Sequence, residues 1–143
     1  PGKIVIIDRQ PYISHPRSKI GNFARVLVGL EELKKRLLTI SGVTDVEIVR
    51  FEGMPFKEQI RTVREAQFLM GNHGAGLTLI AFMDSSAHVL EFTVFPKDFF
   101  DYLASWKGIH HFAMSVTSEN ELADRDILSA SDFVEKIMTK THS

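Results

Sequence analysis

A stretch of small residues, Gly71-Asn72-His73-Gly74-Ala75-Gly76, lies between two apolar runs and most constrains how this chain can fold. The run before it, Phe68–Met70, suits a short buried strand, and the run after it, Leu77–Met83, suits a buried helix. A strand that turns through small residues into a helix directs unpaired N–H groups and the positive end of the helix dipole beyond the sheet edge. Such an arrangement favours an anion, most often phosphate, and glycine permits its close approach.

The stretch matches neither the dinucleotide fingerprint G-x-G-x-x-G nor the P-loop. A tight strand-to-helix turn without any ligand therefore explains its spacing equally well. His73 could donate to a phosphate oxygen or act as an acid or base, but it could also be a polar surface residue of a loop. The stretch alone therefore does not identify a binding site, and other parts of the sequence have to be considered.

Strand and helix patterns alternate along the whole sequence. We expect strands at 3–7, 46–51, 68–70, 89–94 and 111–116, and helices at 22–38, 56–66, 77–83, 97–106 and from Ser131 onward, with a loop at 117–128. The alternation predicts an α/β fold, a Rossmann-like parallel sheet of about five strands with helices on both faces.

The strand order determines where a ligand would bind to such a sheet. For the order 3-2-1-4-5, the crevice lies beyond the carboxyl ends of the first and fourth strands. The loop at 8–22 and the residues after Glu91 would border this crevice, and the turn at 71–76 would lie on its rim.

Composition excludes several classes of protein. The 143 residues fit one domain, residues 1–143, and a net charge of -1 gives no general attraction to nucleic acid or anionic membrane. No apolar run is long enough to span a bilayer, and without cysteine there are no disulfides. The chain enters a strand at Lys3 without an initiator Met or signal peptide, so we expect a fragment of a longer chain.

Several segments, in the same order, resemble glycosyltransferase family 61. They are Asp8-Arg9, the helix start near Asn22, Phe56-x-x-Gln59-Ile60, Gly71 to Thr78 followed by Phe82-Met83, and Val89-Leu90-Glu91. The resemblance implies the GT-B architecture of two facing Rossmann-like lobes, with this chain as the carboxyl lobe that holds the nucleotide diphosphate of a sugar donor. Family members are inverting and generally need no metal, so no metal cofactor is expected.

The resemblance also implies a set of donor contacts. An inverting transfer develops negative charge on the leaving UDP, which a metal-free enzyme must stabilise with fixed positive donors. The candidate nucleotide-sugar-binding residues are Arg9, Arg17, Lys19, Asn22, His73, Gly74, Ala75, Gly76 and Glu91.

Each candidate outside the glycine-rich stretch has a structural alternative. The basic residues of the 8–22 loop could simply be solvated, and Asn22 is first a helix cap. Glu91 either accepts hydrogen bonds from ribose or sugar hydroxyls or forms a structural pair with an Arg or a backbone N–H. Gln59 either orients the glycine-rich stretch or lies on a helix surface.

Some features depart from the family pattern or imitate other sites. Ser18 stands where the family usually has an arginine, and Asp84 stands where a proline commonly follows Phe-Met. Asp124-Arg125-Asp126 imitates a metal-binding Asp-x-Asp, but we interpret it as a solvated loop. His110-His111 could bind a metal only with further partners, which the sequence does not identify, and we interpret the two as core or edge packing residues.

The first functional hypothesis is the donor-binding lobe of an inverting, metal-independent hexosyl- or pentosyltransferase that uses a UDP-GlcNAc or UDP-xylose type donor. Its catalytic base is unknown and expected in the missing lobe, with His73 as a possible helper, so the fragment alone should be inactive. A glycan or glycoprotein acceptor would bind through that lobe. The alternatives are a nucleotide- or phosphate-binding module without transferase activity and a degenerate interaction lobe. The compartment stays open: the Golgi or ER lumen in a eukaryote, the cytoplasm in a bacterium.

Overall fold

The computed structural model describes residues 2–8, 28–51, 53–72, 82–93, 110–116 and 121–142. Within them, a five-stranded parallel sheet is formed by β1 (Lys3–Ile7), β2 (Asp45–Val49), β3 (Phe68–Asn72), β4 (His88–Thr93) and β5 (His110–Ser115). The predicted α/β class is confirmed. Every predicted strand matches an observed one to within two residues at each end.

The strand order is β2-β1-β3-β4-β5, so the expected order 3-2-1-4-5 is wrong. The connection from β2 to β3 passes back across β1 instead of continuing outward. Alternating strand and helix patterns do not specify on which side of β1 the third strand pairs. The observed order is the flavodoxin-like one, in which the direction of winding reverses between β1 and β3.

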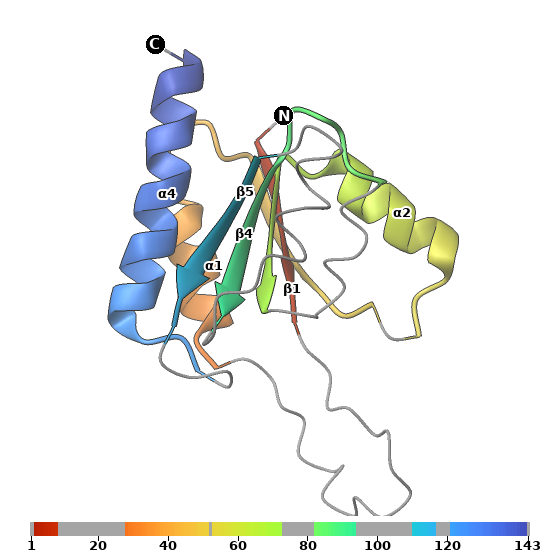
Figure 1. Ribbon diagram of the computed structural model, residues 1–143, viewed down its shortest axis with the longest axis horizontal. Helices are drawn as coiled ribbons and strands as arrows, with labels where there is room; N and C mark the ends of the chain where they lie inside the picture. Colours follow the sequence, from red (N-terminus) through yellow and green to blue (C-terminus); the bar gives the residue numbers. More distant parts are fainter. Residues whose placement is uncertain are drawn as a thin grey trace, which may run out of the picture.

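Helices cover both faces of the sheet, as expected. Figure 1 shows α1 (Leu30–Leu37) and α4 (Asp124–His142) on one side and α2 (Phe56–Glu65) on the other. The strands serve both layers because successive side chains point to opposite faces. In β1, Ile4 and Ile6 pack with α1 and α4, whereas Val5 and Ile7 pack on the face of α2.

The observed start of α1 differs from the predicted start at Asn22. The helix begins at Leu30, after Gly29 with φ of 101°, while residues 22–27 lie outside the described part of the chain. A Cβ on Gly29 would lie 3.0 Å from the carbonyl oxygen of Leu122. The left-handed backbone and this close approach both require glycine here.

The last helix begins earlier than predicted, at Asp124 instead of Ser131. The Asp126 carboxylate accepts a 2.8 Å hydrogen bond from the backbone N–H of Ala123, which satisfies a donor at the helix start. The interpretation of 124–126 as a solvated loop is therefore wrong for the loop and for Asp126, which is buried, whereas Asp124 and Arg125 are exposed. Its polar residues make up the first turn of a helix.

Two other predicted helices cannot be compared in full. Residues 77–81 and 97–106 lie outside the described residues, although Met83, at the end of the first, is buried on the face of α2. Among the described helices, none is both long and apolar enough to cross a lipid bilayer.

Candidate functional site

At the carboxyl edge of the sheet, β1 and β2 end at the same level and the neighbouring β3 ends one residue further on, at Asn72. Ile7 of β1 is in register with Val49 of β2 on one side and with Gly71 of β3 on the other. Because ligands of such sheets bind where the winding reverses, the candidate crevice lies beyond β1 and β3. The expected location between the first and fourth strands is wrong, because β3 separates them.

The two segments that carry most of the predicted donor contacts start from this point. The segment with Arg9, Arg17, Lys19 and Asn22 follows β1, and the segment with His73, Gly74, Ala75 and Gly76 follows β3. These eight residues lie outside the described part of the chain, so their contacts stay predictions. The structure brings the starts of both segments side by side, since neighbouring strands are about 5 Å apart.

Glu91, the ninth candidate, is described and lies within β4 as a buried residue with 0% exposure. Its Oε1 is 3.0 Å from Nε2 of His111 in β5, which is also buried. Glu91 lies on the same face as Val89, which packs on the α2 side. The structural pair considered for Glu91 therefore exists, and its partner among the described residues is His111. A contact with donor hydroxyls stays a prediction.

One pair at the carboxyl edge escaped the sequence reasoning. Asp8 directly follows β1 and is buried, and its Oδ2 lies 3.1 Å from Nε of Arg50, which directly follows β2. The side chain of Arg50 is 42% exposed. The available signal was positional, because polar residues that directly follow neighbouring parallel strands meet at one edge.

Gln59 has a different role from both alternatives considered. Its Nε2 donates to the carbonyl oxygens of Phe51 at 3.1 Å and Met54 at 2.8 Å. The side chain therefore closes the connection between β2 and α2.

Histidines pack across β4 and β5 on the opposite face from Glu91. The imidazole of His88 stacks on His110, with ring centroids 4.7 Å apart, and on Phe68, with centroids 5.3 Å apart. The expectation that His110-His111 packs is confirmed. Within the described ranges, no three or more His, Asp or Glu side chains converge on a possible metal position.

His88 should make folding sensitive to acid. Burial, together with the nearby His110, lowers the pKa of His88 to about 4, and its buried Nδ1 has no hydrogen-bond partner among the described residues. In the unfolded chain, His88 takes up a proton near pH 6.5. The contribution of the neutral, buried imidazole to folding stability is therefore complete above pH 6.5 and is lost as the pH falls to about 4.

We expect protonation of His88 to lower the free energy of unfolding by roughly 2–3 kcal/mol between pH 7 and 4, which urea unfolding can measure. His88→Phe should reduce the acid sensitivity by this amount, because phenylalanine can stack without taking up a proton. An unchanged pH dependence in the variant would contradict the prediction.

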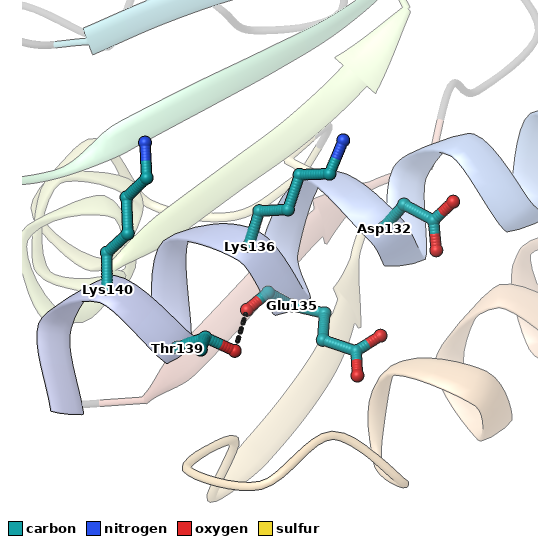
Figure 2. A pocket seen from close by; sticks show the side chains of 5 residues that line it. All are labelled: Asp132, Glu135, Lys136, Thr139 and Lys140. Atoms are coloured by element: carbon teal, nitrogen blue, oxygen red, sulfur yellow. Dashed lines mark hydrogen bonds between the residues drawn. The ribbon is translucent and has the colours of Figure 1, made fainter. Parts of the chain in front are cut away.

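A hollow on the surface of α4 is not part of the candidate crevice. It is lined by Asp132, Glu135, Lys136, Thr139 and Lys140 (Figure 2). These residues belong to the carboxyl-terminal part of α4, which Figure 1 places beside the amino ends of the strands. The hollow therefore lies toward the opposite end of the sheet from Asp8 and Arg50.

Comparison with known families agrees with this geometry. The profile described as Glycosyltransferase 61 matches residues 1–90, which include the carboxyl ends of β1, β2 and β3 and the whole glycine-rich stretch. The chain belongs to glycosyltransferase family 61. Glu91 and His111 lie beyond the matched range.

Two curated relatives of this family 61 chain are plant enzymes. A beta-1,2-xylosyltransferase of Arabidopsis thaliana is 29% identical over 126 residues, which cover 80% of this chain and 23% of the relative. A beta-1,2-xylosyltransferase of Oryza sativa subsp. japonica is 27% identical over 125 residues, which cover 79% of this chain and 22% of the relative. The chain thus spans less than a quarter of the length of these relatives.

A solved structure supports the fold of this family 61 chain. The crystal structure of a flavodoxin-like domain of a Synechococcus sp. protein matches with a TM-score of 0.59 and 14% sequence identity. The match covers 96% of this chain and 99% of the other. At this identity, the likeness concerns the fold alone.

Proposed function

We propose that this family 61 chain is the donor-binding lobe of an inverting glycosyltransferase that uses a UDP-sugar. The observation that carries the proposal is that β1 and β3 are neighbours where the winding reverses and end within one residue of each other. This arrangement starts the basic segment and the glycine-rich stretch side by side, at the place where parallel sheets of this kind bind phosphates.

The proposed donor is UDP-xylose in preference to UDP-GlcNAc. Both plant relatives are named as beta-1,2-xylosyltransferases, which favours a pentose. The xylose of UDP-xylose is α-linked, so the formation of a β-linkage from it is an inversion.

The proposed chemistry assigns charge stabilisation to this chain. The N–H groups of Gly74 to Gly76, the imidazole of His73 and the basic residues after β1 would hold the diphosphate as negative charge develops on it. No metal is part of the proposal. The base that deprotonates the acceptor hydroxyl would come from another part of a longer protein, as would most acceptor contacts. The isolated chain should therefore bind the donor without transferring the sugar.

A ligand titration tests this proposal. UDP, UDP-xylose, UDP-GlcNAc and ADP are titrated into the 143-residue chain and followed by saturation-transfer NMR. We expect selective binding of the uridine nucleotides, weakened at least tenfold by His73→Ala and by Gly74→Val, about 1.4 kcal/mol or more. His110→Ala, a histidine at the amino end of β5, is the matched control for His73→Ala and should leave binding unchanged.

The alternatives predict other results. Equal binding of UDP and ADP would indicate a phosphate-binding module without a role in sugar transfer. Turnover of UDP-xylose by the isolated chain would contradict the assignment of the base to another part of the protein.

A further inference from the structure

Among the described residues that directly follow a strand, Arg50 is the one with a positively charged side chain near the candidate crevice. The residues that directly follow β1, β2 and β4 are Asp8, Arg50 and a residue outside the described ranges, and β3 continues into the glycine-rich stretch. Since Ile7 is in register with both Val49 and Gly71, Arg50, which directly follows β2, and Asn72, the last residue of β3, lie on either side of Asp8. Their backbones are separated by about two strand spacings, roughly 10 Å.

The ion pair with Asp8 turns Arg50 toward this crevice. Arg50 follows β2, the edge strand next to β1. Its Nε nevertheless lies 3.1 Å from Oδ2 of Asp8, which follows β1. The side chain therefore reaches inward, toward the point where the winding reverses. Asp8 is itself fixed, because its backbone N–H donates to the carbonyl oxygen of Val49 at 2.8 Å and its side chain is buried.

The contact leaves the rest of the guanidinium available. Only Nε of Arg50 is engaged by Asp8, and the side chain is 42% exposed. The two terminal nitrogens make no hydrogen bond to the described residues. A guanidinium held by a carboxylate on one edge presents its other donors in a fixed direction, and their planar arrangement suits two phosphate oxygens.

We propose that Arg50 is a phosphate-binding residue of the donor site and that Asp8 is its positioning residue. This inference rests on the proposed function and extends it to a residue outside the predicted donor contacts. Arg50 supplies charge to the diphosphate from the β2 side of the crevice, across β1 from the end of β3. Its prior ion pair with Asp8 reduces the ordering that binding would otherwise require.

Binding of three ligands to matched variants tests the inference. The ligands are UDP, inorganic pyrophosphate and uridine, and the variants are Arg50→Gln, Arg50→Lys and Arg61→Gln. Arg61 is an exposed arginine within α2, so its replacement makes the same change of charge away from the strand ends. Thermal unfolding of each variant identifies the temperature at which all are folded.

We expect Arg50→Gln to weaken the binding of UDP and of pyrophosphate about tenfold. Arg61→Gln should change both affinities less than about twofold. Arg50→Lys should fall between these values, because lysine keeps the charge and loses the planar pair of donors. Uridine, which has no phosphate, should bind all variants equally. The difference between wild type and Arg50→Gln should shrink as salt is raised, which a purely structural defect would not do.

The outcomes separate this inference from the proposed function. Equal UDP affinities of Arg50→Gln and Arg61→Gln would overturn the role of Arg50 and leave the proposed function standing. Arg50-dependent binding of pyrophosphate without any preference for UDP over ADP would support Arg50 and overturn the sugar-donor function. A wild-type chain that binds neither UDP nor pyrophosphate would overturn both.

Discussion

Replacement of His111 by phenylalanine should lower the free energy of unfolding by about 3–5 kcal/mol. The variant leaves the carboxylate of Glu91, which has 0% exposure, without the imidazole that now lies 3.0 Å away. Removal of one hydrogen-bonding partner from a buried carboxylate costs far more than the contact contributed when intact. Urea unfolding at pH 7 measures the loss directly.

The neighbouring histidine provides the control for this prediction. His110→Phe makes the same replacement one residue earlier in β5, at an exposed position on the other face of the sheet. It should change stability by less than about 1 kcal/mol, because phenylalanine can stack on His88. The double variant Glu91→Gln with His111→Phe should lose less than the two single losses added together. Equal losses in the two histidine variants would refute a special role of the buried pair.

Truncation of Phe92 should have an effect of similar size, about 3–5 kcal/mol. Phe92 in β4 is 1% exposed and packs in the core formed with α1 and α4. Its removal leaves a cavity between the sheet and these helices in addition to the lost burial of the ring. Because a domain of this size is stable by only about 5–15 kcal/mol, Phe92→Ala should visibly lower the unfolding midpoint.

Phe112→Ala is the matched control on the next strand. Phe112 is 50% exposed and stacks on Phe133, with ring centroids 5.2 Å apart. We expect its truncation to cost no more than about 1.5 kcal/mol. A cost equal to that of Phe92→Ala would show that α4 depends on Phe112 more than its exposure indicates.

The strands could be predicted from the sequence because their apolar runs are short and rich in β-branched residues. Lys3–Ile7 is the clearest example, with both faces buried. The strand order could not be predicted, because it depends on which side of β1 accepts β3. The early start of α4 was missed because Asp124 and Asp126 are polar, and their effect depends on N–H groups that exist only once the helix has formed.

Part of the candidate site could likewise be predicted from the sequence, and part could not. The glycine-rich stretch has a local signature, and the resemblance to family 61 could be stated from it. The pair of Asp8 and Arg50 has no local signature, since its members are 42 residues apart and meet only through the register of β1 and β2. The partner of Glu91 was equally inaccessible, because His111 is brought to it by pairing of β4 with β5.

The pairing of β1 with β3 fixes the points at which two segments of the candidate site leave the sheet. The segment from Asp8 to Val28 and the segment from Asn72 to Phe82 both leave and rejoin described parts of the chain. Exchange of either segment between family members would keep its point of departure fixed by the register of Ile7 with Gly71. Under the proposed function, donor preference would diversify by replacement of these two segments on a constant sheet.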